Sequence, residues 1–188
     1  MRIISGSLKG KKLFQPIDKN TRPLKDLVKE SIFNILQHST DNKVDLLNSN
    51  ILDLFSGTGS FGIECLSRGA KNVFFCENYQ NSIKILEKNI NYLNLEGRSE
   101  IIKKSAYDIK NHFLNKKKID LIFLDPPFKD KNIQHLLLKI KNLKILNENG
   151  IIILHRHKSE NDDFSNIFKI IEQKKYGISK ISFLTNLN

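Results

Sequence analysis

The sequence predicts an open, doubly wound α/β sheet that is mostly parallel and has an antiparallel last strand. Strand-like and helix-like segments alternate between residues 50 and 155, which is typical of chains built from β-α-β units. Apolar runs such as Leu121–Leu124 are nearly continuous, as in parallel strands covered on both faces. Two more strand-like segments close the chain around a turn at Tyr176-Gly177, and we expect them to form an antiparallel edge.

The hydrophobic periodicity gives the elements in order. Strands are expected at residues 50–55, 72–77, 100–103, 119–124 and 150–155, followed by the closing strands at 168–174 and 179–184. Helices are expected at residues 60–68, 80–93, 107–114 and 132–143.

A smaller N-terminal extension precedes this region. Arg2–Ser5 and Lys11–Phe14 are expected to form a hairpin, because glycines lie between these strand-like segments. Thr21-Arg22-Pro23 is expected to open a helix, since proline suits a first helical turn. That helix continues with apolar residues at helical spacing, namely Leu24, Leu27, Val28, Ile32, Ile35 and Leu36. We therefore expect an extension over residues 1–42 and a main domain over residues 43–188.

Length and composition exclude several classes of protein. At 188 residues the chain can bury a core of its own, and no apolar run approaches the roughly 20 residues of a membrane span. The first residues lack the apolar segment of a signal peptide. Cys65 and Cys76 are too few for a disulfide framework, so we expect them to be reduced core residues of a cytoplasmic protein.

The formal net charge of +11 favours a polyanionic partner. The amino-acid bias of an AT-rich genome is an alternative origin for part of it. The distribution favours a binding surface near the N-terminus, because eight basic residues there are opposed by only three acidic ones. The basic residues are Arg2, Lys9, Lys11, Lys12, Lys19, Arg22, Lys25 and Lys29, and the acidic ones are Asp18, Asp26 and Glu30.

A glycine-rich loop, Asp53–Gly62, joins the first predicted strand to the next helix. Gly57 and Gly59 allow a sharp turn and a close approach of the backbone to a ligand. The loop lies at the carboxyl edge of the sheet, where open α/β folds bind their ligands. Glu77 ends the next strand and can accept hydrogen bonds from ribose hydroxyls.

The same glycines fit the dinucleotide fingerprint, so a nicotinamide-dependent oxidoreductase is one alternative. Asp53 argues against it, because dinucleotide-binding domains usually carry an apolar residue at that position. A carboxylate there instead suits the amino group of a cationic amino-acid ligand such as S-adenosylmethionine.

Asp125-Pro126-Pro127-Phe128 follows the fourth predicted strand at the same edge of the sheet. The prolines fix the backbone, so that the Pro126 carbonyl and the Asp125 carboxylate can both accept hydrogen bonds from one exocyclic amine. Two acceptors draw the nitrogen toward a pyramidal form and free its lone pair for attack on a methyl sulfonium. Phe128 offers a ring on which a base can stack.

Motifs along essentially the whole chain resemble the RsmD family, the bacterial 16S ribosomal RNA guanine-N2 methyltransferases. The segments that carry the resemblance are, in order, Arg2–Gly6, Lys9-Gly10, Thr21–Pro23, Glu30–Leu36, Asp53–Gly62, Leu66–Ala70 and Asp125–Phe128. The N-terminal segments and Ser67–Ala70 are specific to that family, whereas the core motifs are shared with other methyltransferases.

The resemblance implies a class I methyltransferase fold, S-adenosylmethionine as donor and a guanine of 16S rRNA as acceptor, within an assembled or nearly assembled small subunit. The predicted catalytic residues are Asp125, Pro126, Pro127 and Phe128. The predicted cofactor-binding residues are Asp53, Phe55, Gly57, Thr58, Gly59, Glu77, Asn78, Ser105 and Ala106. The predicted RNA contacts are Lys9, Lys11, Lys12 and Arg22, and we expect a monomer without a metal.

Two positions depart from the family pattern. Ser105 stands where related enzymes usually place an Asp or Asn that meets the adenine amino group, and serine has a shorter reach. His155-Arg156-His157 stands at the end of the fifth strand, where an acidic residue is expected, and RNA contact is the role it suggests. Because His155 and His157 lack a third metal ligand, we expect them at the surface.

Other functions stay open. The chemistry of Asp125–Phe128 serves any exocyclic amine, so an N6-adenine methyltransferase acting on DNA or RNA is the main alternative. A non-catalytic RNA-binding or assembly factor is another. The serine at position 105 keeps that alternative in consideration, although the intact motifs argue against it.

Overall fold

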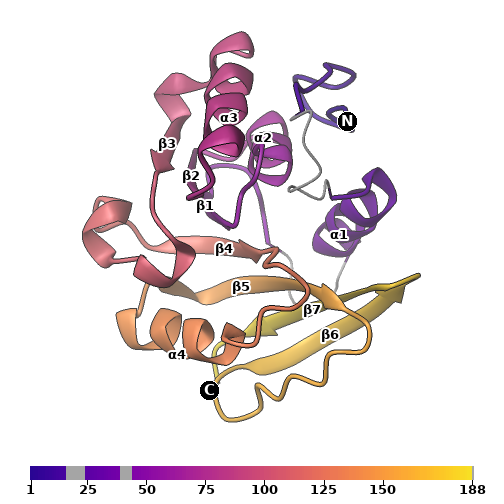
Figure 1. Cartoon of the computed structure of the whole chain (residues 1–188), viewed down its shortest axis with the longest axis vertical. Coiled ribbons are helices and arrows are strands. Elements are labelled where there is room, and N and C mark those ends of the chain that lie inside the picture. Colours follow the sequence, from indigo (N-terminus) through magenta and orange to yellow (C-terminus); the bar gives the residue numbers. More distant parts are fainter. Residues whose placement is uncertain (16–23, 39–43, 188) are drawn as a thin grey trace.

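The computed structural model describes residues 1–15, 24–38 and 44–187, and its seven-stranded sheet has the order β3-β2-β1-β4-β5-β7-β6 (Figure 1). The strands are β1 (Asn50–Leu54), β2 (Asn72–Cys76), β3 (Ser99–Ile102), β4 (Ile119–Leu124), β5 (Leu146–His157), β6 (Lys169–Tyr176) and β7 (Ser179–Thr185). The α-helices are α1 (Asp26–His38), α2 (Ser60–Ser67), α3 (Gln80–Tyr92) and α4 (Ile133–Leu143).

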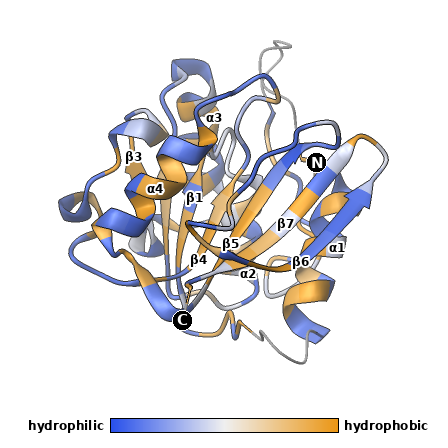
Figure 2. Cartoon of the chain, turned by 90° about the horizontal axis from the view of Figure 1, so that it is seen from below, coloured by the Kyte–Doolittle hydropathy of each residue, from blue (hydrophilic) through white to orange (hydrophobic). Residues whose placement is uncertain are grey.

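The predicted mostly parallel sheet with an antiparallel last strand is confirmed. Strands β1 to β5 run parallel, and β7 runs antiparallel to both β5 and β6. The antiparallel strand is not the edge, however, because β7 inserts between β5 and β6. In Figure 2 the central strands are mostly hydrophobic and β6 is mostly hydrophilic, as suits a strand with one face and one edge in solvent.

Helices cover both faces of the sheet (Figure 1). One face packs against α1, α2 and α3, and the other against α4 and the segment that follows β3. The alternation of side chains along each strand divides the core accordingly. Ile51 and Phe123 point to the first face, while Leu52 and Ile122 point to the second.

The segment after β3 differs from the prediction. Instead of one helix over residues 107–114, two 3₁₀ turns occur at Ala106–Asp108 and Asn111–Leu114. Ile109 and Leu114 are both fully buried in the same cluster. A continuous α-helix places residues five apart about 140° around its axis, so it would bury only one of them, whereas two short turns bury both.

The N-terminal segments pair as predicted. The Ile3 N–H donates to the Lys11 carbonyl at 3.0 Å, and the Leu13 N–H donates to the Met1 carbonyl at 3.1 Å. Helix α1 begins at Asp26, and the predicted helix start at 21–23 and the predicted boundary at 42/43 lie outside the described residues. Leu27 of the predicted apolar stripe is 68% exposed.

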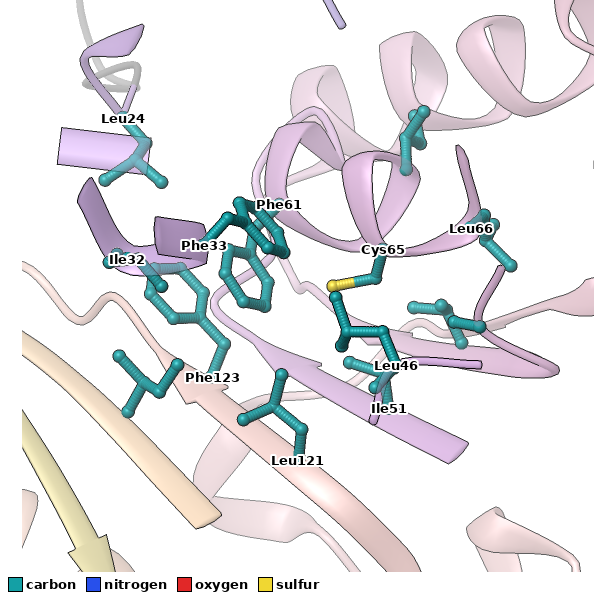
Figure 3. Packing of buried hydrophobic residues seen from close by; sticks show 14 of the residues in the cluster. Leu24, Ile32, Phe33, Leu46, Ile51, Phe61, Cys65, Leu66, Leu121 and Phe123 are labelled. Carbon is teal, nitrogen blue, oxygen red and sulfur yellow. The ribbon is translucent and has the colours of Figure 1, made fainter. Parts of the chain in front are cut away.

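Three phenylalanine rings join α1 and α2 to the sheet (Figure 3). Phe61 of α2 stacks on Phe33 of α1 and on Phe123 of β4, with ring centroids 5.1 and 3.9 Å apart. The hairpin contributes Ile3 and Leu13 to the same cluster. The N-terminal extension therefore shares one hydrophobic core with the α/β sheet.

A buried carboxylate fastens the hairpin to α2. Glu64 is fully buried, and its two oxygens accept hydrogen bonds from the N–H groups of Ile4 at 2.8 Å and Ser5 at 2.9 Å. The Arg68 guanidinium donates to the same carboxylate at 2.9 Å. One glutamate thus compensates two backbone donors that would otherwise lie unpaired against the helix.

Helix α1 meets the same carboxylate through Lys29. Its ammonium lies 3.6 Å from Glu64 Oε2 and donates to the Arg2 carbonyl at 3.0 Å and to Ser60 Oγ at 3.2 Å. Burial, partly offset by the Glu64 charge, lowers the pKa of Lys29. Lys29 therefore does not contribute to the basic surface that the sequence suggested.

Both cysteines are buried and unpaired core residues, as predicted. Burial raises the pKa of the Cys76 thiol to about 12, which makes it a poor nucleophile at neutral pH. Across the described ranges of the chain, no helix is both long and apolar enough to cross a membrane.

We expect Glu64→Ala to lower the free energy of unfolding by about 3–5 kcal/mol, because it leaves a buried ammonium and two backbone donors without their acceptor. Urea denaturation followed by circular dichroism measures the loss. Glu87→Ala is the matched control, since Glu87 pairs with Lys103 on the exposed surface and should cost less than about 1 kcal/mol. Equal losses in the two variants would contradict the role given to Glu64.

Candidate cofactor and active site

Strands β1 and β4 lie side by side, and the space beyond their carboxyl ends is where open α/β sheets form a ligand-binding crevice. Strand β1 leads into α2 on one face of the sheet, and β4 leads toward α4 on the other. The loops that follow the two strands start together, since the Asp125 N–H donates to the Leu54 carbonyl at 3.4 Å. Open α/β sheets bind ligands at such a topological switch point.

The glycines of the loop after β1 serve two different purposes. At Gly57, where φ is +55°, a Cβ atom would meet no heavy atom within 4 Å, so the loop is open to a ligand on this side. At Gly59, where φ is +84°, a Cβ would lie 2.4 Å from Leu86 Cδ1. Gly57 thus fits the predicted close approach to a ligand, whereas Gly59 is required by the packing of α3.

Phe55 carries the turn out of β1. It adopts a left-handed backbone with φ of +61°, which is uncommon for a residue with a large side chain. Its half-buried ring packs edge-on against Tyr107 at 6.1 Å between centroids. Thr58, farther along the loop, is buried and its carbonyl accepts a hydrogen bond from the Asn89 amide at 3.0 Å.

Asp53 lies beneath this loop, at 1% exposure, and its Oδ2 accepts a hydrogen bond from the Gly62 N–H at 3.0 Å. Burial raises the pKa of Asp53 well above its usual value, and the negative charges of Asp125 and Glu77 raise it further. Three carboxylates from the ends of β1, β2 and β4 therefore share one electrostatic environment. A cationic ligand in the crevice would relieve their repulsion.

Glu77 shapes the loop as well as facing the crevice. Its Oε2 accepts from the Gly57 N–H at 2.7 Å, and its Oε1 accepts from the N–H groups of Asn78 and Tyr79, both at 2.9 Å. A carboxylate offers roughly four acceptor positions. About one therefore remains for a ribose hydroxyl, where the sequence suggested two. Asn78 is exposed beside it.

Ser105 and Ala106 follow β3 at the same edge of the sheet. The Ser105 hydroxyl oxygen accepts a hydrogen bond from the Tyr107 N–H at 3.3 Å and so caps the 3₁₀ turn. Ala106 is buried. The side chain predicted to meet adenine is therefore already engaged in a local contact, and one further lone pair of its oxygen is available to an amine.

The Asp125–Phe128 segment leaves β4 at this crevice. Asp125 is partly exposed, and one of its carboxylate oxygens lies 2.8 Å from His155 Nδ1. The Pro126 carbonyl accepts no hydrogen bond from residues 1–15, 24–38 or 44–187. Phe128 is half-buried and lies edge-on to the rings of His155 and His157, at 5.6 and 5.2 Å.

Arg156 holds the loop that continues from Phe128. Its side chain is 1% exposed and donates to the carbonyls of Pro127 at 3.4 Å and Asp130 at 2.6 Å. Its charge is balanced by Asp162 at 3.1 Å and Glu160 at 3.3 Å. Arg156 is thus a structural anchor of the loop, and the RNA contact suggested by the sequence does not apply to this buried side chain.

The opposite side of the same loop is held by Tyr107, whose hydroxyl donates to Asp130 Oδ1 at 2.7 Å.

The expectation that His155 lies at the surface is wrong, because it is 1% exposed. In the sequence, His155 and Arg156 stand out only as a departure from an expected acidic residue. Their partners in the segment after β4 lie 26 to 30 residues away in the chain, and no periodic pattern marks these contacts.

The predicted RNA contacts are only partly described. Lys9, Lys11 and Lys12 are exposed on the hairpin, and Arg22 lies outside the described residues. The turn of the hairpin rests on the end of α2, where the Ser7 N–H donates to the Ser67 carbonyl at 2.8 Å. About 12 Å of helix separates that end from the crevice, so Lys9 is remote from the site.

Metal-ligating side chains do not cluster in the described part of the chain. Among its residues, no group of three or more His, Cys, Asp or Glu side chains is placed to hold an ion.

A family model described as "Conserved hypothetical protein 95" matches residues 1–185. Ribosomal RNA small subunit methyltransferase D of Haemophilus influenzae is 31% identical over 95% of this chain and 90% of its own length.

Two solved structures show the fold. One from Escherichia coli, provisionally named a methyltransferase, covers 100% of this chain and 99% of its own at a TM-score of 0.81 and 23% identity. One from Haemophilus influenzae, provisionally named a methylase, covers 100% and 98% at a TM-score of 0.75 and 29% identity. The fold is that of the class I methyltransferases. The chain belongs to the family of conserved hypothetical protein 95, the RsmD family that its motifs resemble.

Proposed function

We propose that this chain transfers a methyl group from S-adenosylmethionine to the exocyclic N2 of a guanine in 16S rRNA of the small ribosomal subunit. The observation that carries the proposal is the meeting of the Asp53–Gly59 loop and the Asp125–Phe128 segment at the β1/β4 switch point. A relative named as a small-subunit rRNA methyltransferase supports the RNA class. We further propose that the chain acts in the cytoplasm as a monomer on an assembled or nearly assembled subunit.

The residues at the crevice fit the proposed cofactor. S-adenosylmethionine carries an ammonium and a sulfonium, and the carboxylates of Asp53 and Glu77 supply the opposite charge. Gly57 leaves room for the ligand, and the remaining acceptor position of Glu77 suits a ribose hydroxyl. When bound, the cofactor supplies a methyl group already activated by the sulfonium.

The protein's task is then to align an amine. The exocyclic amine of the base has two N–H groups. One can donate a hydrogen bond to a carboxylate oxygen of Asp125, and the other can donate to the Pro126 carbonyl. A bound cofactor would supply the methyl group, and the lone pair of the aligned nitrogen would form the new bond to carbon as the carbon–sulfur bond breaks toward sulfur. The nitrogen is then cationic, and its proton leaves to water. Alignment of this kind accounts for most of the acceleration expected.

The acceptor base distinguishes the proposal from an N6-adenine methyltransferase, since both would use the same two acceptors. Purified protein is incubated with radiolabelled S-adenosylmethionine and small subunits from cells that lack this gene, with naked 16S rRNA in parallel. The RNA is digested to nucleosides. Label in N2-methylguanosine supports the proposal, and label in N6-methyladenosine replaces it with the alternative.

We expect Asp125→Ala to abolish transfer and to leave the dissociation constant for S-adenosylmethionine nearly unchanged, because it removes an acceptor for the substrate amine and leaves the glycine loop intact. Single-turnover labelling and a calorimetric titration measure the two quantities. Asp163→Ala is the control, since that carboxylate is exposed and, among the described residues, accepts its hydrogen bond from the nearby Ser165. Normal methylation by Asp125→Ala would rule out its catalytic role.

Asp53→Asn should weaken cofactor binding by on the order of 10-fold or more, as for loss of a hydrogen bond to a charged group. It should also raise the free energy of unfolding at pH 7. The pKa of Asp53 is raised in the folded state, so the native carboxyl costs stability as pH rises above its unfolded value of about 3.9. Urea melts between pH 4 and 8 should show the gain of the variant growing with pH. Unchanged affinity would refute the contact with the cofactor.

Lys11→Ala combined with Lys12→Ala should raise KM for the RNA and leave KM for S-adenosylmethionine unchanged. The slope of log affinity against log salt should fall by about 1 for each phosphate that no longer meets a lysine. Lys71→Ala combined with Lys141→Ala removes the same charge from two exposed positions outside the hairpin. If both pairs weaken RNA binding equally, the effect is one of net charge and the hairpin does not bind RNA specifically.

A further inference from the structure

The end of β5 places a histidine directly beside the proposed catalytic carboxylate. Leu124 of β4 pairs with Leu154 of β5 in a parallel register, so Asp125 and His155 are the next residues of their strands and point to the same face. His155 Nδ1 lies 2.8 Å from Asp125 Oδ1. The His155 side chain is 2% exposed, against 17% for Asp125, so the carboxylate faces the crevice and the ring lies behind it.

The other ring nitrogen is held as well. His155 Nε2 lies 2.8 Å from the hydroxyl oxygen of Ser179 on β7. An ionised carboxylate only accepts hydrogen bonds, so Nδ1 carries the proton of that contact. In the neutral ring Nε2 is then an acceptor, and the Ser179 hydroxyl donates a hydrogen bond to it. The chain of donors runs from Ser179 through His155 to Asp125.

On the basis of the function proposed above, we propose that His155 is a positioning residue for methyl transfer. It fixes Oδ1 of Asp125 and so leaves Oδ2 aimed at the substrate amine. Without this partner the carboxylate could rotate about its Cβ–Cγ bond, since His155 is the side chain that holds it among the residues that the structure describes. The edge-on contact of Phe128 with the His155 ring, at 5.6 Å, ties the base-stacking ring to the same support.

Three substitutions at one position separate this role from simple packing. His155→Asn keeps an N–H donor near the place of Nδ1, whereas His155→Gln carries its amide farther out, near the place of Nε2. His155→Leu fills the space without a donor. We expect His155→Asn to keep kcat within a few-fold of the unsubstituted protein, and the other two to lower kcat by on the order of 10- to 100-fold, as for a misaligned reactant. KM and the dissociation constant for S-adenosylmethionine should stay unchanged.

A spectroscopic measurement tests the pairing without any need for activity. Long-range ¹H–¹⁵N correlation spectra of the histidine rings should show His155 as the Nδ1–H tautomer in the full-length protein, and Asp125→Ala should relax that preference. The Nε2–H tautomer in the unsubstituted protein would overturn the proposal. This readout also decides the matter if a His155 variant fails to fold.

The activities of the three His155 variants also test the positioning role. Full activity of His155→Leu, or equal losses in His155→Asn and His155→Gln, would overturn the positioning role. If the unsubstituted protein methylates no RNA, the proposed function fails, while the tautomer measurement still supports or refutes the Ser179–His155–Asp125 chain.

Discussion

The adjacency of β1 and β4 is the constraint on which the rest of this structure depends. Because β1 continues into a helix on one face of the sheet and β4 into a helix on the other, the two loops diverge and leave a crevice between them. Asp53 of β1 pairs with Phe123 of β4, and Asp125 lies two residues after Phe123. Because alternate residues of a strand share a face, Asp53 and Asp125 both point to the face covered by α1, α2 and α3. The concentration of negative charge at the crevice follows from topology and register together.

The N-terminal extension is bound to this framework by buried charge as well as by apolar contact. Glu64 accepts hydrogen bonds from the hairpin and from Arg68 on its own helix, and it pairs with Lys29 on α1. Buried ion pairs contribute little net stability, and their better-attested effect is to fix one arrangement among several. The pair therefore sets how the hairpin and α1 lie along α2, and so where the exposed lysines stand relative to the crevice.

The strand and helix pattern was predictable because apolar periodicity reports burial, and burial here follows the layers of the sheet. The segment at 107–114 was not, since Ile109 and Leu114 had to reach one face over five residues and only two tight turns achieve that. The glycine loop and Asp125–Phe128 were recognisable because their chemistry is local in sequence. The contacts of His155, Arg156, Glu64 and Lys29 were not predicted, because each acts through a partner that only the folded register brings near.

Two adjacent side chains at the end of β5 hold the Asp125–Phe128 segment and the loop after it from the two faces of the sheet. Successive residues of a strand point to opposite faces, so His155 and Arg156 cannot reach the same partner. His155 meets Asp125 on the face of α2, while Arg156 passes to the other face and holds the carbonyls of Pro127 and Asp130. A segment whose prolines remove backbone donors gains few hydrogen bonds from its neighbours. Two adjacent side chains of β5 supply the missing restraints, and the Pro126 carbonyl between them accepts no hydrogen bond from the described residues.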